Sequence, residues 1–321
     1  MRGHGRDDGA VYKRWSQFGV PLNIDPLTIP DVIEKRQQRG GRTWWLPGDH
    51  SYWTPQSRWM ANRMPPHSVD ELTDPSRRRI VSNFRTLALS YAITATDFHS
   101  ANAVNYVCTG PYQLDFLSSN TRSKVRRGMK RFNVRRCNPG EVIENGYLAA
   151  YDTKRRVGAT PAGVAQHRLW IEQLDQDGYQ LWGAVHESGE IAAWAAVLAV
   201  DNWAIIPVER SQDRFRRDYA NNALLFGILE DLLSNGTTKS VSYGWSSLQA
   251  NSRIETLHDF KLSMGFQAIP LRRVVWFRAP IGSVVRSRFA RGIITTALRS
   301  RPNSYHLGKA AGLIEAAGNT K

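Results

Sequence analysis

The chain has 321 residues, of which 41% are hydrophobic and 10% aromatic. This composition supplies a core, excludes a wholly disordered chain and, at roughly 150 residues per domain, indicates about two domains. No apolar stretch approaches the ~18 residues of a membrane-spanning helix, residues 1–10 lack the apolar segment of a secretory signal, and two cysteines are too few for a disulfide framework or a four-cysteine zinc site. We therefore expect a soluble, cytoplasmic protein with no metal site.

Positive charge is concentrated in two segments. Lys and Arg total 43 against 28 Asp and Glu, a formal excess of +15. Residues 121–137 hold eight basic residues and residues 278–301 hold six arginines, and neither segment contains an acid. Because the rest of the chain is nearly neutral, these two segments indicate local sites for phosphates or anionic surfaces.

The first predicted elements follow a long irregular region. Tryptophan, proline and glycine are frequent in residues 1–79, which we expect to be an irregular extension wrapped on the core. From residue 132 the pattern becomes regular, with a strand at 132–136 and a helix at 141–156. Thr160 and Pro161 then read as the cap and first residue of a second helix.

Three strands with short turns come next. They occupy residues 179–186, 191–200 and 203–210, a spacing that predicts antiparallel hairpins. An arginine-rich loop then leads to a leucine-rich helix capped by Asn221 or Asn222. The remaining elements are a strand at 240–245, a helix capped by Ser252 and one or two strands within 266–277. This β-α-α-β-β-β-α-β-α-β order predicts an α/β (α+β) fold, a mixed sheet flanked by helices.

The C-terminal segment, 279–321, begins as a basic amphipathic helix. Its apolar positions recur about every four residues, at Ile281, Val284, Val285, Phe289, Ile293, Ala297 and Leu298. Arginines lie among and beyond them. Two interpretations fit: the helix lies in an anionic membrane interface, at the inner face of the membrane, or it docks on the rest of the protein with its arginines in water.

The order of elements resembles that of the GNAT superfamily N-acetyltransferases. Within it, DFKLSMGFQAIP at 259–270 resembles the "FK…GF…P" ending of the Fem-type peptidoglycan aminoacyltransferases. LSSNTRSKVRRGMKRF at 117–132 resembles their basic helix, YANNALLFGILEDLLSNG at 219–236 their donor-side helix, and VSYGWSS at 241–247 the strand after it. The resemblance covers roughly residues 80–278 and is most specific at 259–270.

The resemblance implies an acyltransferase and a division of the chain. It makes 132–278 a GNAT-like catalytic domain and 80–131 a partial GNAT-like unit with a basic helix, between the extension 1–79 and the tail 279–321. It also leaves open a degenerate second GNAT-like unit in the N-terminal half. The donor would be an acyl-CoA or an aminoacyl-tRNA acting as co-substrate, with no resident cofactor. The acceptor would be an amine of a sugar, a peptide or a cell-envelope precursor. A lipid-linked acceptor is one of the alternatives.

The donor-side helix departs from the pattern of the acetyl-CoA enzymes. Those enzymes carry Q/R-x-x-G-x-G/A, whose glycines let backbone N–H groups cradle a pyrophosphate at a helix N-terminus. Here Arg217 is retained, but Ala220 and Asn222 stand at the glycine positions, with Asn221 between them. These four residues are the expected donor-binding residues, and the departure argues against tight CoA binding while leaving room for an aminoacyl-tRNA.

Three residues are the expected catalytic group. Glu209, after an apolar strand, is the candidate base; its bland alternative is a solvated acid paired with an arginine. Tyr243 is the candidate proton donor to the leaving group, or a core tyrosine. Lys261 matches the lysine that faces the reaction centre in the Fem-like relatives, where a cation stabilises an oxyanion; its alternative is a surface lysine.

Several other residues are weaker candidates. Arg210, Tyr219 and Trp245 are the expected substrate-binding residues, with solvation or packing as their alternatives. His167 and His258 read as structural because no second ligand completes a metal spacing. Phosphate-loop, zinc-protease and nucleophile-elbow motifs do not occur. The competing function is a non-catalytic RNA-binding protein that uses the basic helix at 121–136, although Phe132 is the only aromatic residue there for stacking on bases.

Overall fold

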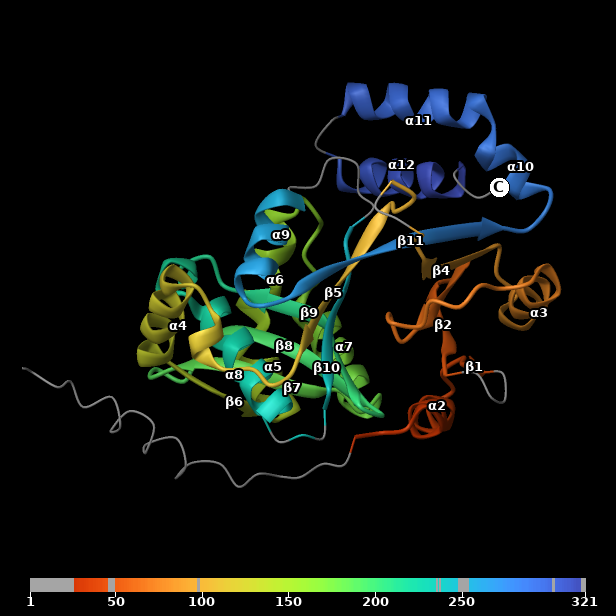
Figure 1. Ribbon diagram of the computed structural model, residues 1–321. Coiled ribbons are helices and arrows are strands. Elements are labelled where there is room, and N and C mark those ends of the chain that lie inside the picture. The colour runs from red at the N-terminus through yellow and green to blue at the C-terminus, as the bar shows by residue number, and fades with distance from the viewer. Residues whose placement is uncertain are drawn as a thin grey trace, which may run out of the picture.

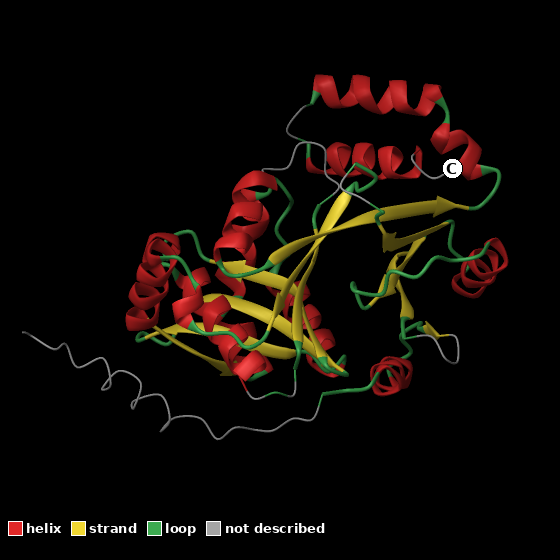
Figure 2. Ribbon diagram, in the orientation of Figure 1, coloured by secondary structure: helices red, strands yellow, loops and turns green. Residues whose placement is uncertain are grey.

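The computed structural model describes residues 26–45, 50–96, 99–234, 236, 238–247, 254–301 and 304–318. The Ser252 cap and residues 1–10 lie outside these ranges. Within them, one continuous mixed sheet runs through the whole molecule (Figure 2). Its strands, in spatial order, are β1 (Trp44–Trp45), β2 (Tyr52–Ser57), β3 (Met60–Met64), β4 (Ala88–Thr94), β11 (Gln267–Phe277), β5 (Ala103–Thr109), β10 (Ser240–Trp245), β9 (Trp203–Ser211), β8 (Ile191–Val200), β7 (Gln180–His186) and β6 (Phe132–Cys137).

Helices cover both faces of this sheet (Figure 1). They are α2 (Ile29–Gln38), α3 (Asp74–Phe84), α4 (Ser119–Arg131), α5 (Pro139–Asn145), α6 (Tyr147–Arg156), α7 (Val164–Gln176), α8 (Ala220–Ser234), α9 (Ile254–Ser263), α10 (Ile281–Arg286), α11 (Arg288–Ser300) and α12 (Tyr305–Gly318). The mixed sheet flanked by helices confirms the predicted fold class.

Strand β8 shows how the C-terminal half is packed. All ten of its residues are buried, because helices lie against both of its faces. Ala193 and Ala195 join the apolar cluster under α4 and α8, whereas Trp194 and Leu198 join the cluster under α5, α6 and α7. The period-2 alternation of a strand therefore places two cores on opposite sides of one sheet.

We call the part of the chain with β1 to β5 the N-terminal half and the part with β6 to β11 the C-terminal half. The two halves exchange strands at the centre of the sheet. Strand β5 follows β4 in the chain but pairs with β10 and β11, whereas β11 follows β10 and α9 but pairs with β4 and β5. The spatial order β4-β11-β5-β10 results. Each half thus completes the sheet of the other, and residues 103–109 are needed to cover one edge of β10.

The N-terminal region is more regular than the composition predicted. We expected residues 1–79 to be irregular, but α2, β1, β2 and β3 lie within this range and α3 begins in it. Thr28 and Asp31 form a capping box on α2, and Trp53 is buried beside Tyr91 of β4. The tryptophans supply core to short strands whose alternation is too brief to be recognised in the sequence.

Three predicted helix boundaries were wrong. The helix expected at 141–156 is divided at Gly146, whose carbonyl oxygen accepts a hydrogen bond from the Trp194 indole at 3.0 Å. Helix α7 begins at Val164 after Gly163, not at Pro161. Helix α8 begins at Ala220, and Asn221 and Asn222 lie inside its first turn, so neither residue caps it.

The C-terminal segment forms three helices that double back over β11 (Figure 1). Ala316 and Ala317 of α12 are buried against Met60, Ala88 and Val275 of the sheet. Helix α11 lies on α12 and away from the sheet. The predicted single helix is interrupted at Ser287, which ends α10 and caps α11.

Candidate active site

The candidate site begins where the parallel ladder between β9 and β10 stops. The two strands pair over three positions only, the last of them Ser242 with Ile205. Pro207 follows in β9 without an N–H to donate, and the register of β9 against β8 shifts at this point. In β10 the register shifts between Ser242 and Gly244. Both strands are therefore irregular at the same level, which prevents further pairing.

The glycine after the irregularity in β10 is required by its backbone. Gly244 has φ of +81°, a left-handed conformation that L side chains rarely adopt. Its N–H donates to Ser242 Oγ at 3.1 Å, and that hydroxyl donates to Asn105 Oδ1 at 2.8 Å. These bonds hold the bulged Tyr243 in place.

Glu209 and Tyr243 meet across the two separated strands. The Tyr243 hydroxyl donates a hydrogen bond to Glu209 Oε2, and both residues are half-buried. Arg210 donates to the carbonyl oxygen of Glu209 at 2.8 Å, so the carboxylate itself is held by a tyrosine. Of the two interpretations of Glu209, the structure therefore contradicts a solvated acid.

Lys261 completes the group from α9. Its side chain is only 4% exposed, which contradicts the surface-lysine alternative. Its Nζ lies 3.9 Å from the ring centroid of Tyr106 and 4.1 Å from that of Tyr243. A cation between two aromatic faces is stabilised by their quadrupoles, which offsets part of the cost of removing it from water.

Burial displaces the pKa of each member of this group. It lowers the pKa of Lys261 to about 8, although the charge of Glu209 opposes the shift. Burial raises the pKa of Glu209, against the hydrogen bond from Tyr243 and the charges of Lys261 and Arg210. Burial, followed by the charge of Glu209, raises the pKa of Tyr243 well above 10. Near neutral pH the group therefore holds a protonated tyrosine, and burial favours the uncharged form of Lys261.

Two neighbouring residues belong to this group and were missed in the sequence. Tyr106 of β5 supplies one of the rings over Lys261, and its hydroxyl lies 3.0 Å from His258 Nδ1. We had interpreted His258 as structural. The spacing of His258 and Lys261 on one helix face is a signal that could have found the histidine, but Tyr106 comes from a strand that is exchanged between the halves. His167, in contrast, is buried against the Val142 carbonyl oxygen, as predicted.

The predicted donor-binding residues lie at the start of α8. Tyr219 precedes the helix with φ of +63°, and its carbonyl oxygen accepts the Ala223 N–H at 3.0 Å. Ala220 is buried, and the Asn222 amide donates to Met264 Sδ. Both side chains at the expected glycine positions therefore point into the core.

The remaining two predicted donor-binding residues are less enclosed. Asn221 is half-buried and Arg217 is exposed in the short helical turn before Tyr219. In the described part of the chain, neither forms a hydrogen bond or ion pair with Glu209, Tyr243 or Lys261, so we treat the start of α8 and the Glu209 group as two separate parts of the candidate site.

Basic side chains of helix α4 lie beside the start of α8. A Cβ added at Gly128 would lie 2.7 Å from the Tyr219 carbonyl oxygen, so this glycine allows the two helices to touch. The Arg127 guanidinium covers the Tyr219 ring at 4.7 Å, and Arg131 lies 3.4 Å from Asp218. Basic side chains of α4 thus surround a helix N-terminus, where the helix dipole also favours an anion.

Two of the expected substrate-binding residues direct their side chains away from the Glu209 carboxylate. Arg210 points to the opposite face of β9, where its guanidinium covers the Trp170 ring at 5.4 Å. Trp245 donates to the Pro66 carbonyl oxygen at 2.8 Å and packs beside Arg273. Trp245 therefore joins the two halves of the molecule, as its packing alternative proposed.

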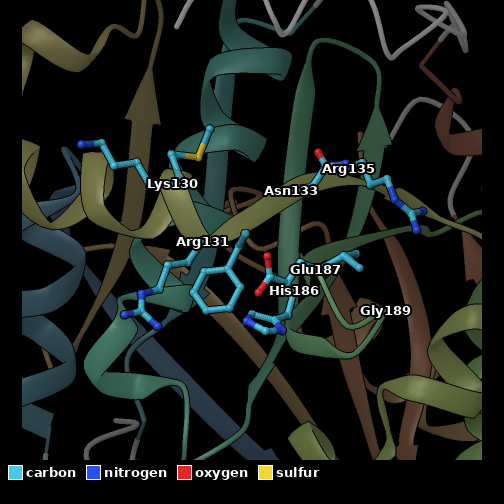
Figure 3. Close-up of a pocket in the computed structure, with 10 residues that line it drawn as sticks. Lys130, Arg131, Asn133, Arg135, His186, Glu187 and Gly189 are labelled. Atoms are coloured by element: carbon cyan, nitrogen blue, oxygen red, sulfur yellow. The ribbon is translucent and has the colours of Figure 1, made fainter.

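A cavity of about 470 Å³ opens beside α4 at the edge strand β6 (Figure 3). Lys130, Arg131 and Arg135 contribute cations to its wall, and Glu187 and His186 come from the β7–β8 hairpin. Residues of the Glu209 group do not line it. The cavity extends the basic surface of α4 and is distinct from the catalytic candidates.

The described residues contain neither a metal-binding cluster nor a membrane-spanning helix. Across the described ranges, no three His, Cys, Asp or Glu side chains gather in a way that could hold a metal ion. In the same part of the chain, no helix has both the length and the apolar character needed to cross a bilayer.

Comparison with known proteins identifies the fold. No protein-family model matches the chain, and no curated protein sequence matches it significantly. Among solved structures, FemX superposes with a TM-score of 0.53 at 11% identity, over 78% of this chain and 92% of that one. L-PGS from Bacillus licheniformis superposes with a TM-score of 0.51 at 12% identity, over 85% and 98%. A tandem GNAT protein from the clavulanic acid biosynthesis pathway matches over 85% and 95% at 13% identity, with a TM-score of 0.45. The fold is therefore similar to those of FemX and L-PGS.

Proposed function

We propose that this protein is an acyltransferase that moves an acetyl or aminoacyl group from a thioester or an aminoacyl-tRNA to an amine. The observation that carries the proposal is the group formed by Glu209, Tyr243 and Lys261 where β9 and β10 separate. A buried acid, a hydrogen-bonded tyrosine and a desolvated lysine are the components that acyl transfer to an amine needs. The Fem-type fold supports the same reaction class by analogy.

In the proposed mechanism, the amine attacks the acyl carbonyl directly and no covalent enzyme intermediate forms. Glu209, directly or through water, takes the proton of the attacking amine as the C–N bond forms. Lys261 and backbone N–H groups stabilise the tetrahedral oxyanion. As the C–S or C–O bond breaks, Tyr243 gives its proton to the leaving group. The Tyr243 to Glu209 hydrogen bond then returns the proton from Glu209 to Tyr243 and resets both groups.

The electrostatics of Tyr243 favour an ester donor within this proposal. Its pKa lies well above 10, so Tyr243 is a weak acid. A thiolate, with a pKa of roughly 8.5, leaves without needing such a proton, whereas an alkoxide is far more basic and gains from one. The cations of α4 are also compatible with a polyanionic donor. We therefore propose an aminoacyl-tRNA ahead of an acyl-CoA, with Arg217, Asn221 and Tyr219 near its phosphates.

The acceptor follows from the same chemistry. An uncharged amine must reach Glu209, and we propose an amino sugar, a peptide or a cell-envelope precursor. A lipid-linked acceptor would bring this protein, cytoplasmic in the proposal, to the inner face of the membrane.

Transfer assays can test the proposed reaction. Native mass spectrometry of the purified chain with aminoacyl-tRNA and with acyl-CoA species identifies the donor. Transfer of a radiolabelled aminoacyl group to a panel of amino sugars and peptides then measures turnover. We expect Glu209→Gln to lower transfer by about 10³-fold. Glu187→Gln, which changes an exposed acid of a neighbouring hairpin, should leave it unchanged. Equal turnover in all three proteins would refute the assignment of the site.

A non-catalytic RNA-binding protein is the second candidate. The observation that favours it is the exposed basic face of α4, which includes Arg126, Arg127 and Lys130. Such a protein would bind RNA with a strong dependence on salt, and Glu209→Gln would leave binding unchanged. Salt-dependent RNA binding without transfer from any donor would select this function.

A further inference from the structure

Helix α11 exposes apolar side chains although it belongs to a folded helical pair. None of its residues is buried. Phe289 is 77% exposed and Ile293 is 55% exposed, and these residues lie one turn apart on the same face. Val284 of the preceding helix α10 is 64% exposed. The sequence pattern predicts one apolar face for this segment. In the structure, some of these apolar residues face α12 and others face outward.

The inner apolar positions of α11 are occupied by its contact with α12. Ile294, Ala297 and Leu298 are half-covered, and α12 in turn packs on β11. The segment therefore docks on the protein through α12, as one of the two interpretations proposed, and Phe289 and Ile293 remain outside. Packing within the described chain does not explain these two residues.

The charge carried by α10 and α11 themselves is entirely positive. Residues 278–301 contain six arginines and no acid. Five of them, Arg286, Arg288, Arg291, Arg299 and Arg301, are exposed on α10, α11 and the residue after α11. Within the described ranges none of these five is recorded in an ion pair. We call Val284, Phe289 and Ile293 the apolar ridge. An apolar ridge next to arginines is complementary to a lipid bilayer, in which acyl chains lie below negatively charged headgroups.

We propose that α10 and α11 form a docking surface for an anionic lipid bilayer, with Val284, Phe289 and Ile293 inserted and the arginines on the headgroups. Charge complementarity selects this occupant, because a second copy of the chain would bring arginines against arginines. The arginine stems can extend along the apolar layer while their guanidinium groups stay with phosphates. Docking does not depend on the transferase reaction, so it extends the proposed function and stands or falls separately.

The test measures the partition of the full-length protein between buffer and vesicles. We expect it to sediment with vesicles that contain about one third phosphatidylglycerol and not with pure phosphatidylcholine vesicles, and added salt should release it. The double variant Phe289→Ser/Ile293→Ser should lower the partition coefficient at least about tenfold, because the apolar insertion is lost. Point substitutions are preferred to truncation, because removing 280–321 would also remove α12 from the sheet.

Two control variants identify the surface that binds. Val164→Ser/Leu169→Ser changes two similarly exposed apolar residues of α7 and should not alter the partition. Arg126→Gln/Arg127→Gln removes charge from α4, and a small effect is expected. Binding that survives the α11 substitutions but is lost with the α4 charges would overturn the proposal. A dimer in light scattering that Phe289→Ser/Ile293→Ser dissociates would assign the ridge to a second copy instead and would also overturn it. Circular dichroism confirms that each variant is folded.

Discussion

Two segments of the sheet share one topology but differ in how the buried cation beside each of them is compensated. In each half, a strand, a helix and a second strand form a parallel pair: β3-α3-β4 and β9-α8-β10. Each pair is hydrogen-bonded over three positions at the start of the strands, ending at Asn62 with Ser90 and at Ile205 with Ser242. The two segments therefore repeat one strand-helix-strand arrangement, and the second GNAT-like unit that the resemblance left open stays a prediction.

The two parallel ladders, β3–β4 and β9–β10, each have a buried cation next to them, and the two cations have different partners. Arg63, just past the β3–β4 ladder, is 1% exposed and donates to Ser51 Oγ at 2.8 Å and to Asp70 at 2.8 and 3.0 Å. Lys261, beside the β9–β10 ladder, faces two tyrosine rings and has a pKa lowered to about 8. A buried cation whose hydrogen bonds are satisfied stabilises structure, whereas one that is only partly compensated remains available to bind a developing anion.

Replacing the candidate base should have the largest effect. Glu209→Gln keeps the size of the side chain and the contact with Tyr243 but removes the base, so we expect turnover to fall by about 10³-fold, within the ~10²–10⁴ typical of a general base. The melting temperature should change little or rise, because burial already disfavours the carboxylate. Single-turnover transfer rates provide the measurement. A loss of less than about tenfold would remove Glu209 from the catalytic group.

Lys261 should have the next largest effect. Lys261→Ala is expected to lower turnover by about 100-fold or more, since it removes the oxyanion cation, and to leave the melting temperature nearly unchanged. Lys239→Ala, at an exposed position just before β10, is the matched control. If both alanine variants turned over equally, Lys261 would be a structural residue like Arg63.

The N-terminal counterpart should respond in stability instead. Arg63→Ala leaves the buried Ser51 hydroxyl without its partner, so we expect a loss of about 2 kcal/mol in the free energy of unfolding. In a chain of this length that is about 3 °C in melting temperature. Turnover of the folded fraction should stay within about twofold of wild type. A catalytic defect in a thermally unchanged Arg63→Ala protein would show that both ladder ends serve the reaction.

The pH dependence should be specific to the C-terminal group. Activity needs Glu209 deprotonated and Lys261 protonated, so kcat/KM should rise through the raised pKa of Glu209, above 4.5, and fall near pH 8. Lys261→Arg should remove the alkaline fall, because arginine stays charged. If the acid limb persists in the residual activity of Glu209→Gln, it reports the acceptor amine instead.

The lowered pKa of Lys261 should also make the free energy of unfolding rise with pH. The folded state lowers the pKa of Lys261 from 10.5 to about 8, so the unfolded chain binds more protons between these values. The penalty for burying the ammonium is therefore fully present below pH 8 and is relieved as pH rises toward 10.5. Wild type should gain about 2–3 kcal/mol relative to Lys261→Met over this interval, measured by urea unfolding.

The smallest expected effect concerns the donor helix. The sequence at Ala220 and Asn222 departs from the glycine pattern of the acetyl-CoA enzymes, and on that pattern we predict a Kd for acetyl-CoA above ~100 μM, weaker than about −5.5 kcal/mol. Both side chains point into the core, so the prediction rests on the pattern and not on obstruction by these side chains. Isothermal titration calorimetry measures it directly. Micromolar affinity would return the donor proposal to an acyl-CoA.

Local patterns predicted much of the C-terminal half. The strand at 191–200 was correct to the residue because short turns and an apolar run define a buried hairpin strand without reference to the rest of the chain. The start of α8 was wrong because Asn221 and Asn222 are common caps, but here Tyr219 precedes the helix in a left-handed conformation stabilised by contacts with α4. The roles of Glu209, Tyr243 and Lys261 came from the resemblance and remain predictions; their proximity is what the structure adds.

The sequence by itself determined the fold class, the hairpin strands and the two concentrations of positive charge, because these depend on composition and on short-range periodicity. The three candidate catalytic residues came from the resemblance to a family. Only the tertiary structure decided the exchange of β5 and β11, the partners of Lys261 and the division of the C-terminal segment into a docked α12 and an exposed α11. Pairing between distant strands and the burial of a charged side chain depend on chain segments more than a hundred residues apart. No local pattern encodes that distance, since each segment satisfies its own periodicity whichever partner covers it.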